Sequence, residues 1–181
     1  MARLTRSRES STLSSQARPS LRWTLALTSL ASFMAALDTL VVVTALPAIQ
    51  RSLGTSLSML QWTINAYELA YAAGIITAVG LGDRFGRRRV FTCGLALFTL
   101  ASAACALAPS VSILIAARIA EGAGASMVTP LSLTILSSAF PAERRGAAVG
   151  MLGGMAGLAI AAGPLVGGAV VQGIDWHWIF W

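Results

Sequence analysis

Long apolar runs dominate this chain, and short polar stretches separate them. A helix that crosses a bilayer needs about 20 predominantly apolar residues. Five runs meet that length, and they cover roughly residues 23–47, 61–81, 90–108, 111–137 and 145–171. The pattern therefore predicts an all-α integral membrane protein with five complete transmembrane helices.

The two ends of the chain differ from these runs. Residues 1–22 are polar and rich in Ser and Arg, which predicts a disordered tail. A cleaved signal peptide is the competing interpretation, but its apolar core spans only ~7–15 residues. At the other end, Trp176, Trp178 and Trp181 predict an aromatic belt at a membrane surface. We expect a sixth helix to begin near 176, and we expect the chain to be an N-terminal fragment.

The composition indicates that much of the protein surface faces lipid rather than water. The chain has 56% hydrophobic and only 11% charged residues, against ~25% charged in soluble domains. The net charge is +6, but the arginines lie in short loops rather than on one basic face, which disfavours nucleic-acid binding. Cys93 and Cys105 lie in one run, about 18 Å apart along a helix, too far to pair. We interpret both as small helix residues, and the sequence has no metal-site, phosphate-loop or nucleophile–base pattern, so no enzyme activity is expected.

Arginine placement predicts the orientation. Eleven of the 13 basic residues, all of them Arg, lie in the tail or in the loops after the second and fourth runs. The opposite loops contain Arg51 alone, and Arg118 lies inside a run. Because cytoplasmic loops are enriched in Lys and Arg, we predict a multi-pass protein of the cell membrane with a cytoplasmic N-terminus.

Four ionisable residues lie inside the predicted spans, namely Asp38, Glu68, Arg118 and Glu121. Such residues are costly in a bilayer and usually functional. Counted from the outer helix ends, all four lie roughly 10–15 Å deep, so three helices place them in one layer. Arg118 and Glu121 are three residues apart and can meet on one helix face. We hypothesise that Asp38 or Glu68 then binds a proton; a purely structural ion network is the alternative.

Two further stretches have unusual composition. In "GDRFGRRRV", residues 82–90, Asp83 can bind backbone N–H groups or a nearby Arg, and Gly86 allows a positive φ. The last run is rich in glycine, with the G-x-x-x-G pairs Gly150/Gly154 and Gly163/Gly167 that let helices approach closely. Pro164 removes a backbone donor there and predicts a kink.

Four stretches resemble patterns of the major facilitator superfamily of secondary transporters, and most closely its fourteen-helix drug:proton antiporters. The stretch 82–90 is similar to the loop between helices 2 and 3, which latches the two transporter halves on the cytoplasmic side in that family. The matching residues are Asp83, Arg84, Gly86, Arg87 and Arg88. The stretch "LDTLVVVTALPAI", residues 37–49, resembles the helix 1 signature and contains Asp38.

The other two stretches carry the family's coupling and antiporter patterns. "RIAEGAGAS", residues 118–126, resembles the helix 4 pattern whose Arg is linked to proton coupling, with Glu121 where Gln is usual. "GMLGGMAGLAIAAGPLVGG", residues 150–168, resembles the helix 5 antiporter motif. The matching residues of this last motif are Gly150, Gly163, Pro164, Gly167 and Gly168.

The resemblance implies export of small amphiphilic compounds or drugs in exchange for protons. The implied partners are the lipid bilayer, protons, a small-molecule substrate and the absent C-terminal half of the same transporter. The proton gradient supplies the energy, and no cofactor is expected. Two alternatives stay open, an uptake symporter on the same fold and a membrane scaffold or regulator that transports nothing.

Overall fold

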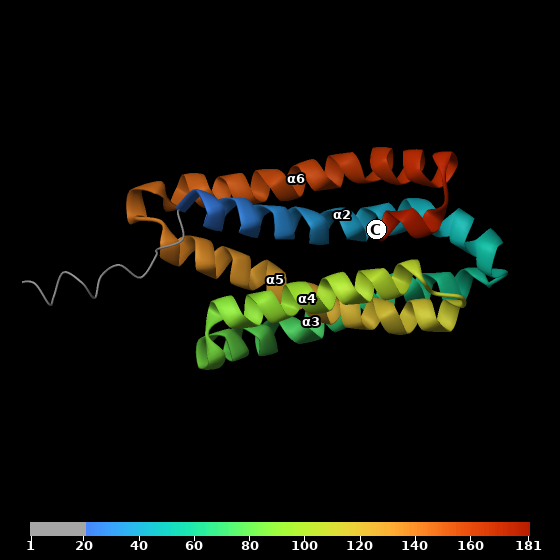
Figure 1. Cartoon of the computed structure of the whole chain (residues 1–181), viewed down its shortest axis with the longest axis horizontal. Coiled ribbons are helices and arrows are strands. Elements are labelled where there is room, and N and C mark those ends of the chain that lie inside the picture. Colours follow the sequence, from blue (N-terminus) through green and yellow to red (C-terminus); the bar gives the residue numbers. More distant parts are fainter. Residues whose placement is uncertain (1–20) are drawn as a thin grey trace, which may run out of the picture.

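The computed structural model describes residues 21–181, which form five α-helices and one short 3-10 helix (Figure 1). The elements are α2 (Leu21–Leu53), α3 (Leu57–Phe85), α4 (Arg87–Ala106), α5 (Val111–Ala139), α6 (Ala142–Gly173) and η1 (Trp176–Ile179). All five α-helices are long and apolar enough to cross a membrane. The predicted all-α fold with five helices of transmembrane length is therefore confirmed. Residues 1–20 of the predicted tail lie outside the described part of the chain.

Most helices extend past the predicted apolar runs, because polar residues cap or continue them. Ser56 accepts a hydrogen bond from the Met59 amide at 3.4 Å and so begins α3. Ser110 begins α5 in the same way. At the N-terminal end of α2, Leu21 and Arg22 belong to the helix rather than to the predicted tail. Hydrophobicity alone marks the part of a helix that meets lipid, not its capped ends.

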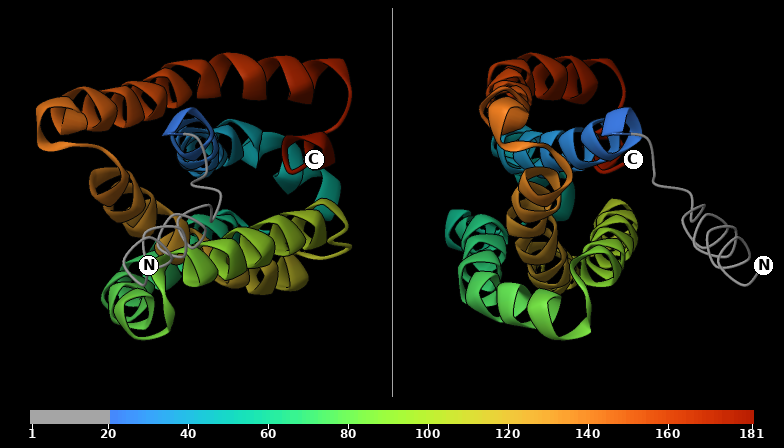
Figure 2. Two further views of the ribbon diagram at one scale, coloured as in Figure 1. Left: turned by 60° about the vertical axis from the view of Figure 1, so that its left-hand side comes forward. Right: turned by 90° about the vertical axis from the view of Figure 1, so that its left-hand side faces the viewer.

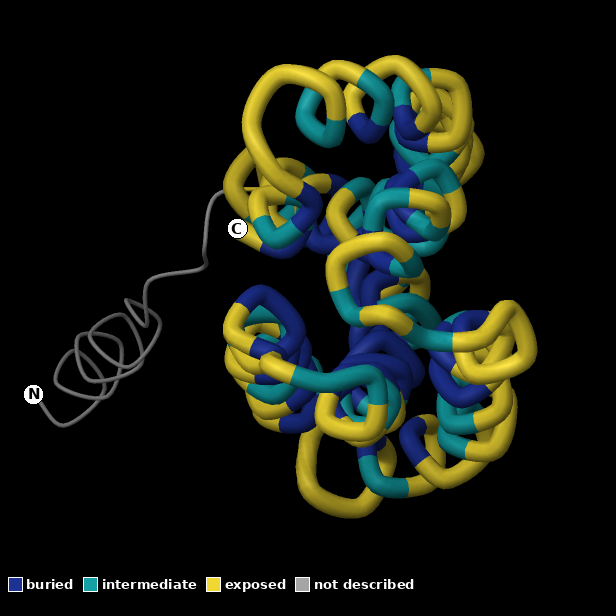
Figure 3. Tube along the Cα trace, turned by 90° about the vertical axis from the view of Figure 1, so that its right-hand side faces the viewer, coloured by how far each residue is buried: buried dark blue, intermediate teal, exposed yellow. Residues whose placement is uncertain are grey.

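Helix α5 lies at the centre of the molecule. It packs against α3 on one side and α4 on the other, and α2 and α6 lie side by side across from this group (Figure 2). Buried positions face inward, whereas the outer faces of the helices are exposed (Figure 3). Large apolar side chains such as Ile76, Leu100 and Leu165 lie on those outer faces and are mostly exposed. An exposed apolar surface of this kind is typical of helices that face lipid.

The turn between α3 and α4 is tight and depends on Gly86. Its φ of 97° is in the region that favours glycine, as the sequence predicted. Arg87 donates to Asp83 at 2.9 Å, so the first residue of α4 holds the end of α3. Both side chains are partly exposed, which makes the turn a polar surface feature between two apolar helices.

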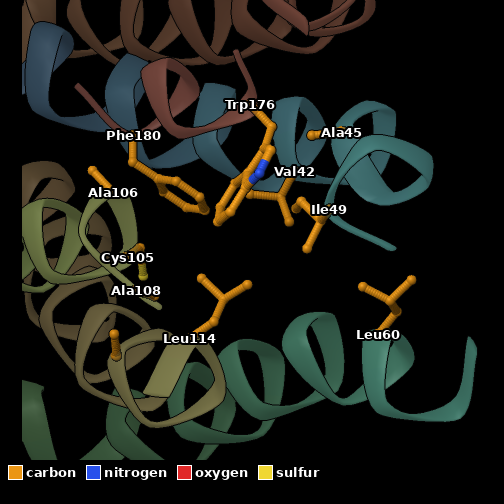
Figure 4. Packing of buried hydrophobic residues seen from close by; sticks show 11 residues of the cluster. Val42, Ala45, Ile49, Leu60, Cys105, Ala106, Ala108, Leu114, Trp176 and Phe180 are labelled. Atoms are coloured by element: carbon orange, nitrogen blue, oxygen red, sulfur yellow. The ribbon is translucent and has the colours of Figure 1, made fainter. Parts of the chain in front are cut away.

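The segment after α6 folds back into the molecule. Asp175 begins η1 by accepting from the backbone amide of His177 at 2.9 Å, and this contact lowers the pKa of the Asp175 carboxyl. The predicted aromatic belt is wrong for Trp176, which is 2% exposed. Its ring packs with Phe180 between α2 and the ends of α4 and α5 (Figure 4). Trp178 and Trp181, by contrast, are exposed. Where we expected a sixth helix to begin, the described structure has only this 3-10 turn.

The glycines of α6 divide into two groups. A Cβ on Gly163 would lie 2.7 Å from the Cβ of Leu40, and one on Gly167 would lie 3.3 Å from the Val41 carbonyl oxygen. This G-x-x-x-G pair therefore brings α6 close to α2, as predicted. Gly150, Gly154 and Gly168 have no described atom near an added Cβ, so the predicted close approach is wrong for the first pair within residues 21–181. Pro164 lies inside the continuous helix α6.

Candidate functional site

A charge network lies between α2, α3, α4 and α5, with Arg118 at its centre. Arg118 Nη1 donates to Asp38 Oδ2 at 2.6 Å and to Glu121 Oε2 at 2.8 Å. Its Nε donates to the Thr63 carbonyl at 3.3 Å. The guanidinium carbon lies 4.1 Å from the centre of the Tyr67 ring. Three of these partners come from helices other than α5, so the network joins separate elements around one cation.

The network is buried. The Arg118 side chain is 1% exposed, that of Glu121 0%, and that of Asp38 9%. A buried charge persists only when partners satisfy it. Arg118 has such partners, but one guanidinium faces two carboxylates here. If both acids are ionised, the site carries one excess negative charge among buried side chains. A proton can remove that excess.

Glu121 has a second neighbour and one free oxygen. Cys105, from α4, donates its thiol to Glu121 Oε2 at 3.4 Å. Oε1 of the same carboxylate has no hydrogen-bond partner among the described residues. Our interpretation of Cys105 as a plain helix residue was therefore incomplete, although both cysteines are free, as expected. A buried oxygen without a partner is where a proton or a small polar molecule gains most.

Glu68 stands apart from this network. It is exposed, and it lines a cavity of 710 Å³ bounded by α2, α3, α5 and α6. The cavity wall also includes Tyr67, whose ring contacts Arg118, so the cavity and the charge network share one side chain. Among the described residues, Glu68 forms neither an ion pair nor a hydrogen bond with a side chain, unlike Asp38 and Glu121.

The structure brings together three of the four predicted coupling residues. The predicted contact between Arg118 and Glu121 is confirmed. Asp38, one of the two acids predicted to bind a proton, also contacts Arg118. Glu68 follows Tyr67 on α3 but does not belong to the charge network around Arg118. The role of all four in proton coupling stays a prediction.

Sequence reasoning missed Thr63, Tyr67 and Cys105 as members of the site. Thr63 and Tyr67 are four residues apart on α3, which places them on one helix face, and this spacing was the available signal. Nothing in the sequence fixed how that face is rotated toward Arg118. In residues 21–181 no group of His, Cys, Asp or Glu side chains could hold a metal ion.

The chain is similar in sequence to known proteins. The chain is 43% identical over 159 residues to the multidrug resistance protein Stp of Mycobacterium tuberculosis, covering 87% of this chain and 30% of that protein. It is 40% identical over 157 residues to the tetracenomycin C resistance and export protein of Streptomyces glaucescens, covering 87% and 29%. The chain thus spans about a third or less of the length of these relatives.

A solved structure shares the fold. It is a bacterial homologue of the human lysosomal transporter Spinster, in an inward-facing and unoccupied conformation. The TM-score is 0.75 at 20% sequence identity, covering 91% of this chain and 40% of that one. The family model described as Major Facilitator Superfamily matches residues 28–181. The chain therefore belongs to the major facilitator superfamily and is a multi-pass membrane protein.

Proposed function

We propose that the protein containing this chain exports small amphiphilic compounds in exchange for protons. The observation that carries the proposal is the sharing of one buried guanidinium, Arg118, by the two carboxylates of Asp38 and Glu121. A site with one cation and two acids can gain and lose a proton without leaving a net charge of more than one unit. The proton gradient would then be the energy source, and no bound cofactor is needed.

Each protonation state favours a different arrangement of helices. Asp38 belongs to α2, whereas Arg118 and Glu121 belong to α5. When Asp38 is ionised, its contact with Arg118 holds α2 against α5. When a proton neutralises Asp38, the ion pair is lost and only weaker contacts remain. A ligand that binds one arrangement better than the other is thereby linked to proton binding.

Export is favoured over uptake by two observations. The stretch 150–168 resembles an antiporter motif, and two relatives carry names that state multidrug resistance or export. We further propose that the Arg-rich side faces the cytoplasm of the cell, with the N-terminus on that side. In this orientation the turn of Asp83, Arg84, Gly86, Arg87 and Arg88 lies at the cytoplasmic surface as a gating loop. The remaining part of the transporter would close the cavity of residues 21–181 from the other side.

The test replaces Asp38 with Asn in the protein produced from its complete gene. In proteoliposomes with an imposed pH gradient, wild type should move substrate against the proton flow. D38N should lose this proton-driven transport and still bind substrate, because asparagine cannot carry a charge but fits the same space. Asp175→Asn is the matched control, since it makes the same change outside the five α-helices. Asparagine can still accept from the His177 amide, so this variant should transport normally.

Three results would contradict parts of the proposal. Full proton coupling in D38N would exclude Asp38 as the coupling acid. Loss of both folding and substrate binding in D38N would favour a purely structural ion network. Movement of protons and substrate in the same direction would make the protein an uptake symporter.

A further inference from the structure

The cavity between α2, α3, α5 and α6 has an uneven chemistry. Its volume of 710 Å³ lies within the range of about 300–1,000 Å³ that is usual for small-molecule sites. Most of its lining is apolar or small, and Glu68 is the only charged residue in the lining. The small polar residues Ser32, Thr39 and Thr129 also line the cavity. Ser32 Oγ is buried and has no partner among the described residues.

The charge of Glu68 is not balanced by any described side chain. The nearest buried cation, Arg118, already contacts Asp38 and Glu121. Other arginines of the described chain lie near helix ends. A carboxylate on a mostly apolar wall attracts a cation, because an apolar wall screens its charge less than bulk water does. A ligand with an anionic group would meet repulsion at the same place.

An aromatic ring lies one helical turn from this carboxylate. Tyr71 is three residues after Glu68, and both line the cavity. The Tyr71 ring stacks on Tyr67 with centroids 6.3 Å apart and planes within 2° of parallel. Tyr67 is almost fully buried and contacts Arg118, whereas Tyr71 is half-buried and contributes to the cavity wall. A flat ring beside a carboxylate suits a ligand that is both apolar and positively charged.

We propose that this cavity selects lipophilic cations and that Glu68 supplies the selecting charge. The inference rests on the proposed export function in one respect, because it assumes that the substrate passes through this cavity. Glu68 acts through direct contact with the cationic group of the ligand, while Tyr71 and the apolar wall contact its body. Glu68 is thus a specificity residue that is distinct from the acids that contact Arg118.

The experiment measures equilibrium binding of three probes of similar shape to the purified protein from the complete gene. Tetraphenylphosphonium is a cation, triphenylphosphine oxide is neutral and tetraphenylborate is an anion. Wild type should prefer the cation to the anion. Glu68→Gln should weaken binding of the cation by about tenfold or more and leave the neutral probe nearly unchanged. Glu68→Lys should reverse the preference toward the anion.

Two matched variants separate this effect from general damage. Glu68→Asp keeps the charge and should keep the cation preference. Glu143→Gln removes an exposed acid in the first turn of α6, outside the cavity lining, and should bind all probes as wild type does. If wild type binds the anion as tightly as the cation, or if E68Q binds the cation as tightly as wild type, the proposal is wrong.

Failure of the cation-site proposal can be told apart from failure of the proposed antiport function. Binding selectivity that depends on Glu68, without proton exchange in proteoliposomes, would support the cation site and contradict antiport. Proton-driven export of a neutral compound, with no effect of E68Q on probe selectivity, would support antiport and contradict the cation site. The wild-type comparison of cation and anion needs no variant, so it can refute the proposal even if E68Q does not fold, and Glu68→Asp and Glu68→Lys then test the role of the charge.

Discussion

At the scale of single residues, one nitrogen atom of Arg118 serves two carboxylates. Nη1 contacts both Asp38 and Glu121, and the buried Glu121 keeps one oxygen free. Removing the arginine would leave two acids without a cation in a buried position. Replacing Glu121 by Gln would leave a carbonyl oxygen that can still accept from Arg118. These two changes therefore have very different consequences for stability.

Arg118→Ala should destabilise the protein by about 3–5 kcal/mol, the usual effect of removing one partner from a buried ion pair. Glu121→Gln is the matched change and should cost much less, since Arg118 keeps its partner at Asp38. Unfolding of the purified protein in detergent, followed by tryptophan fluorescence, measures both. Equal stability of R118A and wild type would show that the acids are not charged in the folded protein or have other partners.

The sequence carried only part of this site. The contact between Arg118 and Glu121 follows from their spacing on one helix, which is local information. The contact with Asp38 joins residues 80 positions apart, and it depends on how α2 and α5 are placed. Thr63, Tyr67 and Cys105 were missed for the same reason, because the rotation of α3 and α4 about their axes cannot be read from composition.

At the scale of helices, Gly124 sets the distance between α5 and α4. An added Cβ on Gly124 would lie 2.6 Å from the Phe98 amide nitrogen and 2.9 Å from the Gly94 carbonyl oxygen. Both are backbone atoms, so they cannot move aside without moving α4. Gly94 and Gly122 lie in similarly close contacts. The repeated glycines in 122–124 are thus a packing device that the G-x-x-x-G pattern did not indicate.

Gly124→Ala should destabilise the protein by about 1–3 kcal/mol through overpacking. Gly146→Ala is its control, because no atom lies within 4 Å of a Cβ there and the residue is inside α6. This control should be neutral or stabilising by up to about 1 kcal/mol from helix propensity. Thermal unfolding of the two variants side by side provides the measurement. A stability loss in G146A as large as that in G124A would contradict the explanation by close contact.

At the scale of the whole molecule, η1 fills the space between the two helix groups at one end. Trp176 and Phe180 form a core cluster with Val42 and Ile49 of α2 and Leu114 of α5 (Figure 4). The Ser102 hydroxyl of α4 donates to the Phe180 carbonyl at 2.9 Å and ties the segment to a third helix. This end of the molecule is therefore closed by side chains, whereas the cavity beside Glu68 is open.

Trp176→Ala should cost about 3–5 kcal/mol, as expected for removal of a large buried aromatic side chain. Trp178→Ala is the matched change in the same turn, and its side chain is 57% exposed. It should alter stability by about 0.5 kcal/mol or less. Differential scanning fluorimetry on both variants tests this. Comparable shifts in the two midpoints would mean that Trp176 does not fill the core.

The overall fold was far more predictable than this end of the molecule. Five apolar runs of sufficient length can form only membrane helices, because backbone groups in lipid must bond within their own segment. The tryptophans near the C-terminal end were open to two interpretations. Composition places such rings at membrane interfaces, but it does not say which of three neighbouring rings turns inward. Trp176 does so because η1 folds back between α2 and α4.

The glycine contacts of α5 have a mechanical consequence. Gly122 and Gly124 bring its backbone against the backbones of α3 and α4, so there is little room for α5 to slide past either helix. Gly163 and Gly167 bring α6 close to α2, where they face mainly the side chains of Leu40 and Thr44. The five α-helices thus form two closely packed groups, one of α3, α4 and α5 and the other of α2 and α6. If Asp38 is the coupling acid, as proposed above, its neutralisation would release α2 from Arg118, and α2 and α6 would then be free to tilt together against the other three helices.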